Sequence, residues 1–172
     1  MSTSKTRKRA VGNDAIQLLR EDHRTVEKLF SEFEKADGDD PYARQAIVGR
    51  TCTKLKIHAA VEEELFYPAL REAFEEDDAS LIDEAEVEHD TAKQLIARLE
   101  SLDAEDPHYT ATFTVLSEYI KHHVKEEENE IFPKAKRAKL DFDDLGARMR
   151  ARTDELTEEM GAAEAAESAA AG

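Results

Sequence analysis

The sequence predicts an all-α protein: an up-down-up-down antiparallel four-helix bundle made from two helical hairpins, with a short extra helix at the C-terminal end. Three observations support this fold class. Charged residues make up 37% of the 172 residues, and only 6 Gly and 4 Pro are present, which favours long helices over a sheet with many turns. Apolar residues recur at steps of three and four in four segments. The second pair of segments repeats the first pair after 65 or 66 residues.

Each predicted helix of the bundle carries one seam of six residues that is expected to face the core. In every seam, polar side chains occupy positions whose neighbours one turn away are mostly apolar. Asn13 or Asp14 is expected to cap the first helix, and Pro68 and Pro133 are expected to end or kink the second and fourth helices. The seams are Ile16, Leu19, His23, Val26, Phe30 and Phe33; Val48, Thr51, Leu55, His58, Glu62 and Phe66; Ile82, Ala85, His89, Ala92, Ile96 and Leu99; and Phe113, Leu116, Ile120, His123, Glu127 and Ile131.

The chain divides into a bundle over residues 13–140 and a shorter amphipathic helix over 141–160. That helix is expected either to cover an end of the bundle or to mediate dimerisation. Residues 1–12 form a basic segment and residues 161–172 an Ala- and Glu-rich one, and both are expected to be disordered tails.

The charge and the cysteine content limit the classes of partner and compartment. A net charge of −16 disfavours nucleic acid and anionic membranes as partners. No apolar run approaches the roughly 20 residues of a membrane span, and the basic start lacks the apolar stretch of a secretory signal. The single cysteine, Cys52, fits a reducing compartment. We expect a cytoplasmic protein that is a monomer or a weak homodimer.

The polar residues of the seams predict a metal site. A buried carboxylate is costly unless it is paired or bound to a metal, and two that face each other also repel. No Lys or Arg occupies an adjacent seam position, whereas histidines do, and a neutral imidazole is a good transition-metal ligand. Each half of the chain would supply two histidines and one glutamate for one of two divalent ions. The candidate ligands are His23, His58, Glu62, His89, His123 and Glu127.

Other polar residues fit this pattern less well. His122 lies about 100° around the helix from His123, so we expect a surface or interface histidine. His108 lies in a connection outside any seam. Glu63 and Glu128 repeat, but they lie off the seams, and we expect them to be outer residues or solvated rather than ligands.

At these residues the chain resembles the hemerythrin-like, His-His-Glu cation-binding family. The resemblance covers about residues 14–140 and implies two iron ions in an oxo- or hydroxo-bridged di-iron centre, with both glutamates bridging. Oxygen-carrying hemerythrins have a further histidine one turn before the third-helix ligand, where this chain has Ala85. The implied centre is therefore more open, or it borrows a carboxylate such as Glu86. The segments that carry the resemblance are "REDHRTVEKLF", "IHAAVEEELFYP", "EVEHDTAKQLI" and "HHVKEEENEIFP".

The resemblance implies several functions. The first is binding of O2, NO or peroxide for sensing, scavenging or defence against oxidative or nitrosative stress, with an aliphatic shell of Val26, Leu55, Ala92 and Ile120 excluding water. The second is an enzyme that disproportionates hydrogen peroxide, with Tyr67 or Tyr119 supplying protons or absorbing radicals. Iron storage or homeostasis and a purely structural zinc or manganese site are the remaining alternatives.

Overall fold

The computed structural model describes residues 14–36, 38 and 40–170, and helices account for nearly all of them; no strand occurs in these ranges. Asp14, one of the two residues expected to cap the first helix, does so by accepting a hydrogen bond from the backbone N–H of Gln17. Pro41 and Pro107 lie in the first turn of their helices, where a missing N–H costs nothing. The helices are α1 (Ala15–Lys35), α2 (Pro41–Val61), α3 (Tyr67–Ala73), α4 (Glu76–Ser101), α5 (Pro107–Glu126), α6 (Phe132–Ala135) and α7 (Phe142–Ala170).

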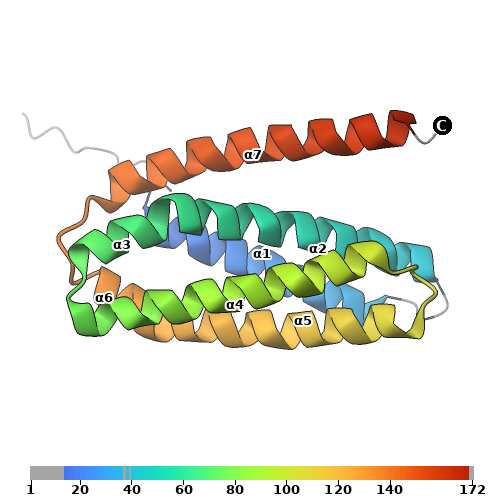
Figure 1. Cartoon of the computed structure of the whole chain (residues 1–172), viewed down its shortest axis with the longest axis horizontal. Helices are drawn as coiled ribbons and strands as arrows, with labels where there is room; N and C mark the ends of the chain where they lie inside the picture. Colours follow the sequence, from blue (N-terminus) through green and yellow to red (C-terminus); the bar gives the residue numbers. More distant parts are fainter. Residues whose placement is uncertain (1–13, 37, 39, 171–172) are drawn as a thin grey trace, which may run out of the picture.

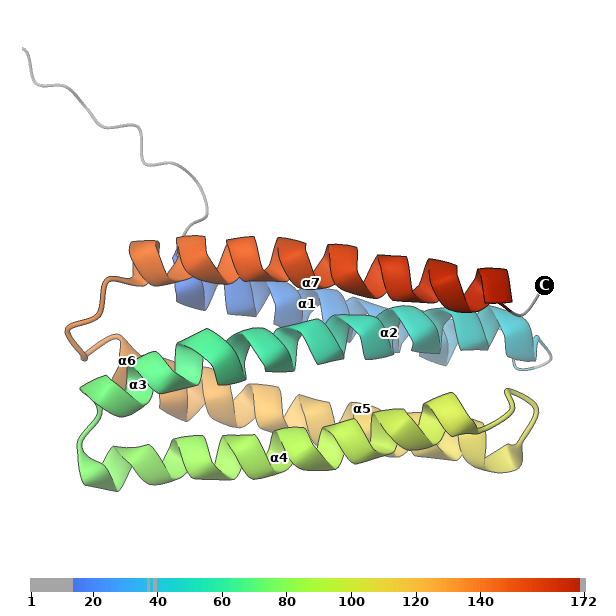
Figure 2. The same ribbon diagram turned by 45° about the horizontal axis from the view of Figure 1, so that its top comes forward.

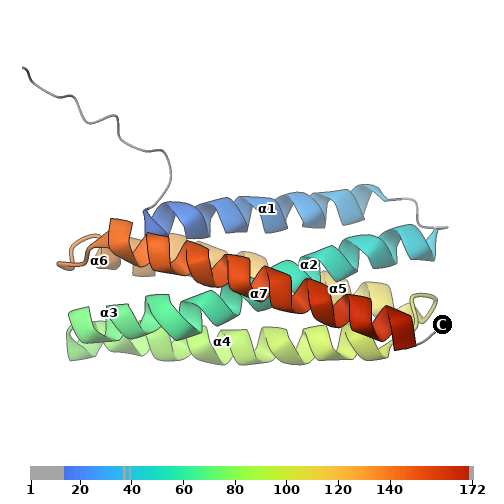
Figure 3. The ribbon, with the colours of Figure 1, turned by 90° about the horizontal axis from the view of Figure 1, so that it is seen from above.

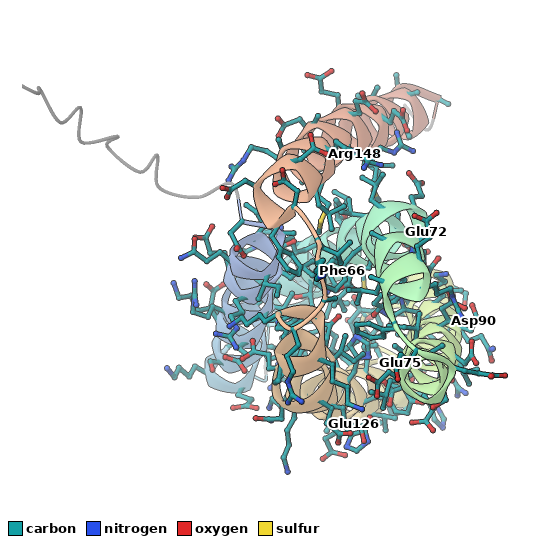
Figure 4. The ribbon with its side chains drawn as sticks, turned by 90° about the vertical axis from the view of Figure 1, so that its left-hand side faces the viewer. Phe66, Glu72, Glu75, Asp90, Glu126 and Arg148 are labelled. Atoms are coloured by element: carbon teal, nitrogen blue, oxygen red, sulfur yellow. The ribbon has the colours of Figure 1, made fainter. Side chains whose placement is uncertain are left out.

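Four rods form the predicted antiparallel bundle: α1, α2 continued by α3, α4, and α5 continued by α6 (Figure 1). Every one of the predicted seam residues is buried, which confirms the spacing argument. The apolar residues gather in two clusters, one towards the α3 and α6 end and one towards the opposite end. Figure 4, which looks along the bundle, shows Phe66 in the interior and Glu72, Asp90 and Glu126 on the outside.

Both proline-containing helices change pitch just before the proline instead of ending there. Glu62–Phe66 and Glu127–Ile131 are π-helical, and the N–H groups of Tyr67 and Phe132 bond to carbonyl oxygens five residues back. Pro68 and Pro133 then lie in the first turn of α3 and α6, where proline is tolerated. The helices therefore continue past the prolines with a local irregularity, so of the two expected outcomes, an end or a kink, the end is wrong.

The C-terminal helix lies along the side of the bundle. α7 packs against α1 and α2 and leaves the bundle ends uncovered (Figures 2 and 3), so the expected cover over an end is wrong. Leu145 and Met149 are buried in this contact, and Arg152 forms hydrogen bonds to both carboxylate oxygens of Glu64.

Helix α7 is longer than the sequence pattern predicted. It runs to Ala170, so residues 161–170 are helical where a disordered tail was expected. Alanine and glutamate have high helix propensities, and a segment made of them extends a helix that is already formed. The predicted tail over 1–12 and residues 171–172 lie outside the described residues. Within the described part, no helix is both long and apolar enough to cross a bilayer.

Candidate metal centre

The six candidate ligands meet in one buried layer inside the bundle. The layer lies between the two apolar clusters and receives one histidine from each of the four rods. All six residues are at most 6% exposed, and both glutamates are fully buried. Glu62 and Glu127 are the first residues of the two π-helical segments, a type of distortion that often occurs at functional sites.

Each carboxylate contacts imidazoles from both hairpins. Oε2 of Glu62 lies 3.1 Å from Nε2 of His58 and 3.3 Å from Nε2 of His89. Oε2 of Glu127 lies 3.1 Å from Nε2 of His23, on the opposite hairpin. Glu62 belongs to both groups of possible ligands, as a bridging carboxylate would. The groups, each with ligand atoms within 4.8 Å of one another, are His23, His58, Glu62 and Glu127, and Glu62, His89 and His123.

Three atoms of this layer form no hydrogen bond within the described residues: Oε1 of Glu62, and the pair Nε2 of His23 and Oε2 of Glu127, which lie 3.1 Å apart without hydrogen-bond geometry. Buried polar atoms are almost always satisfied, so three unsatisfied atoms in one place require an explanation. A divalent cation would satisfy all three and would offset the buried negative charge. Nitrogen and oxygen donors of this kind suit iron and related transition metals. The residues present therefore fit a metal centre.

A carboxylate from a neighbouring rod holds the outer nitrogen, Nδ1, of each imidazole. An Nδ1–H group that donates to a carboxylate fixes the tautomer and leaves the Nε2 lone pair free for a metal. The four pairs form a closed ring around the bundle, because every rod supplies one carboxylate and one imidazole. The pairs and their distances are Asp22 with His58 (3.4 Å), Glu63 with His89 (2.9 Å), Glu88 with His123 (2.6 Å) and Glu128 with His23 (2.9 Å).

Sequence reasoning found half of this outer ring. Glu63 and Glu128 were expected to be outer residues, and the geometry places them there. Asp22 and Glu88 were missed, although a signal for them exists. Each directly precedes the histidine of its helix, and the two are related by the same 66-residue repeat as those histidines.

The charges of the layer shift the pKa values of its members in the metal-free state. Burial lowers the pKa of His58, but the charge of Glu62 and the hydrogen bonds with Asp22 and Glu62 together outweigh burial and raise this pKa to about 10. Burial also opposes ionisation of His89, whose hydrogen bond with Glu62 raises its pKa to about 9. Burial and the charge of Glu62 both raise the pKa of Glu127. The two carboxyls thus resist being ionised together.

Comparison with known proteins places the chain in a family. The family model of the hemerythrin HHE cation binding domain matches residues 14–135 of the sequence, which include all six candidate ligands. The chain belongs to this hemerythrin family. A crystal structure of a hemerythrin HHE cation binding domain-containing protein from Mycobacterium kansasii is similar, with 25% identity and a TM-score of 0.72, over 85% of this chain and 88% of that one.

One curated relative of this hemerythrin domain carries an activity in its name. A protein of Nostoc sp. named DNA nickase is 29% identical over 115 residues, which is 67% of this chain. The matched part spans only 31% of the length of the Nostoc protein. The nickase activity belongs to that longer protein.

The two halves of the hemerythrin domain differ at one position beside the site. Tyr67 is fully buried, and its hydroxyl lies 3.4 Å from Oε2 of Glu62, Oε1 of Glu127 and Nε2 of His89. Its repeat mate is Phe132, which stacks on a histidine but has no hydroxyl. Of these two repeat-related positions, one therefore places a hydroxyl group at the carboxylates and the other does not. Tyr119 is half-buried and forms no hydrogen bond to the six candidate ligands in the described part.

An apolar cavity of about 30 Å³ adjoins the layer on its far side from α3 and α6. This volume exceeds the roughly 10–15 Å³ that a cavity needs to hold one water-sized molecule. All four histidines contribute to its wall. The aliphatic residues expected around the site, Val26, Leu55, Ala92 and Ile120, all line it.

The structure leaves the position beside Ala85 open. Glu86, which might have filled the place of a missing histidine, forms an ion pair with Arg71 instead, at 2.9 Å. A second cavity, of about 100 Å³, lies beside Ala85 and reaches His123 and Glu127. A cavity therefore adjoins the buried layer of the hemerythrin domain on each of two sides.

The remaining two histidines lie at the surface. The side chains of His122 and His108 are 59% and 68% exposed. Neither belongs to the buried layer.

Proposed function

We propose that this hemerythrin-like protein holds two iron ions in the buried layer and binds O2, NO or hydrogen peroxide there, for sensing, scavenging or defence against oxidative or nitrosative stress. The observation that carries the proposal is the pair of ligand groups, with three buried atoms that form no hydrogen bond within the described residues. Iron would supply the electrons for the reaction with these ligands. The proposed ligands are His23, His58, Glu62, His89, His123 and Glu127.

The chain's own residues would position the metal and select its ligand. The outer ring of carboxylates fixes the orientation of the imidazoles, and the π-helical segments place the glutamates between both hairpins. The aliphatic wall of the small cavity excludes bulk water and larger molecules. A small neutral ligand matches this wall better than a charged one.

Metal content and an optical spectrum test the proposal. Protein purified without chelators should contain close to two irons per chain and show near-ultraviolet oxo-to-iron bands. The double variant Glu62→Ala plus Glu127→Ala should lose the iron, whereas His122→Ala, a change at an exposed histidine, should retain it. Zinc alone in the native protein, or full iron loading of the double variant, would contradict the proposed site.

Disproportionation of hydrogen peroxide is the second candidate, and the position of Tyr67 favours it. A hydroxyl within 3.4 Å of both carboxylates could donate and recover a proton during turnover. Tyr67→Phe should then slow gas evolution from peroxide at least 10-fold without loss of iron, while Tyr119→Phe should leave the rate unchanged. Equal rates in the two variants would remove Tyr67 from the reaction.

Two further readings give different outcomes in the same experiments. Iron storage would give an iron content that rises well above two per chain, and a structural zinc site would give zinc alone. We do not extend the nickase activity of the Nostoc relative to this chain, which covers 31% of that protein and carries a net charge of −16.

A further inference from the structure

The cavity beside Ala85 differs in character from the apolar cavity. It lies between α4 and the rod formed by α5 and the second π-helical segment, and its volume is about 100 Å³. Five of its nine lining residues are glutamates, and no Lys or Arg lines it. The lining residues are Leu81, Glu84, Ala85, Glu88, His123, Glu126, Glu127, Glu130 and Ile131.

The glutamates form a path from solvent to the metal layer. Glu84 and Glu130 are exposed at the outer end, and Glu126 is partly exposed there, at the surface seen in Figure 4. At the inner end lie His123, 3% exposed, and Glu127, fully buried with an Oε2 atom that has no hydrogen-bond partner among the described residues. The path therefore ends at an unsatisfied candidate ligand.

A group of three residues that could hold a cation lies at the outer end of this path. Atoms of Glu88, His122 and Glu126 lie within 4.8 Å of one another and could hold an ion. These residues are half-buried or exposed, so ions can reach and leave them quickly.

The repeat-related position on the other half also has a cavity, of about 210 Å³, but neither His58 nor Glu62 lines it. The repeat mate of Ala85 is Leu19, which is 2% exposed and packs in an apolar cluster. Beside Ala85, with its small methyl group, the cavity reaches His123 and Glu127, whereas the cavity beside Leu19 reaches no candidate ligand.

The apolar cavity does not suit a cation. Lys56 and Lys93 line it together with aliphatic side chains, the four histidines and one carboxylate, Asp22, which forms an ion pair with Lys54. Positive charges and an apolar wall repel a divalent ion, whereas a cleft lined by negative charge raises the local concentration of cations and their association rate by 10- to 1,000-fold.

We propose that the acidic cavity beside Ala85 is the entry port for divalent metal ions, and that Glu84, Glu126 and Glu130 bind the ion in transit to Glu127. The proposal rests on the metal centre proposed above. Ions would enter by the acidic side, and small neutral ligands would enter by the apolar side.

The rate of metal uptake tests the port. Co2+ is the probe, because its visible absorption reports binding to nitrogen and oxygen ligands, and metal-free full-length protein is mixed with it at low ionic strength. The triple variant Glu84→Gln, Glu126→Gln and Glu130→Gln should take up Co2+ at least 10-fold more slowly than wild type and reach the same final content. The difference should shrink at 0.5 M salt because of screening.

A matched control separates the port from the loss of net charge. Glu27, Glu105 and Glu118 are exposed glutamates that do not line the cavity, and their triple glutamine variant should load at the wild-type rate. Equal rates in the two triple variants would overturn the port.

A second set of variants tests the passage itself. Ala85→Leu should also slow uptake, because the larger side chain fills the gap, while Ala92→Leu in the apolar cavity should not. Slower uptake in Ala92→Leu alone would move the route to the other cavity. Far-ultraviolet circular dichroism verifies that each variant is folded. A wild type that takes up no Co2+ or iron at equilibrium would refute the metal centre rather than the port.

Discussion

Glu63 touches the proposed metal centre only through His89, so Glu63→Gln isolates the contribution of one outer carboxylate. Oε1 of Glu63 lies 2.9 Å from Nδ1 of His89 and 2.7 Å from Nζ of Lys93. The hydrogen bond with His89 holds the pKa of Glu63 below its ordinary value, so the side chain is ionised at pH 7. Glutamine keeps the shape and an accepting oxygen, and it removes only the charge.

The expected loss is about tenfold in metal affinity. A hydrogen bond to a charged group contributes about 1.5–3 kcal/mol and a neutral one about 0.5–1.5 kcal/mol. The difference is roughly 1–1.5 kcal/mol, and 1.36 kcal/mol corresponds to a factor of ten. Loss of an outer partner of a ligating histidine typically lowers affinity by about 10- to 100-fold. The lower end applies, because Glu63 is 29% exposed and already shares its charge with Lys93.

Competition with a chromophoric chelator under anaerobic conditions measures this loss with ferrous iron. We expect one of the two iron equivalents, the one held near His89, to weaken, and the other to bind as in wild type. Glu64→Gln is the control, because Glu64 points outward to Arg152. Unchanged affinity in Glu63→Gln, or an equal loss in both variants, would refute the role given to the outer ring.

Three further outcomes are expected. Metal binding at pH 7 should release protons, because His58 and His89 have pKa values of about 10 and 9 and a metal displaces the Nε2 proton. Metal affinity should therefore rise as the pH rises towards these values. An indicator dye in weak buffer detects the release, and its absence would contradict the protonation of these two histidines in the metal-free protein. Met149→Ala should lower the free energy of unfolding by about 2–5 kcal/mol in urea titrations, because this side chain is 1% exposed between α7 and the bundle. Arg152→Ala, at a side chain that is 28% exposed, should cost far less, and the reverse order would refute apolar anchoring of α7. Burial raises the pKa of the Cys52 thiol to about 12, so a thiol reagent at pH 8 should modify it only after unfolding in urea.

Much of the bundle and the inner layer of the site could be predicted from the sequence. Helix periodicity is a property of one segment, so the burial of a histidine in an apolar seam, such as His23, can be predicted from its own helix alone. The repeat then relates the two halves and indicates that the buried polar residues serve one centre. The aliphatic cavity wall followed from the same spacing, because its residues lie one turn from the histidines in the seams.

The outer ring could not be predicted in the same way, because its pairs join different rods. Asp22 of α1 holds His58 of α2, and Glu88 of α4 holds His123 of α5. Such pairs depend on the distance and rotation between packed helices, which periodicity within one helix does not contain.

The place of Tyr67 also depended on a feature that the sequence pattern did not reveal. In an uninterrupted α-helix, Tyr67 would point about 140° away from Glu62. The π-helical turn holds one residue more than an α-helical turn, and one residue corresponds to about 100° around the helix. Tyr67 therefore points to within about 40° of the direction of Glu62. The hydroxyl thus reaches the carboxylates. Proline explains where the helix is irregular, but it does not predict which irregularity forms.

The closed ring of carboxylates and imidazoles has a consequence for assembly. Within each hairpin only one imidazole is held by its own half: His58 by Asp22, and His123 by Glu88. The other two pairs, in which Glu63 and Glu128 take part, cross between the hairpins. A single hairpin therefore has one imidazole and one carboxylate left unpaired, and these could pair with the carboxylate and the imidazole of a second copy of the same hairpin. Two such hairpins on separate chains could close the same ring as a symmetric pair, and the covalent link at residues 74–75 makes that pairing independent of protein concentration.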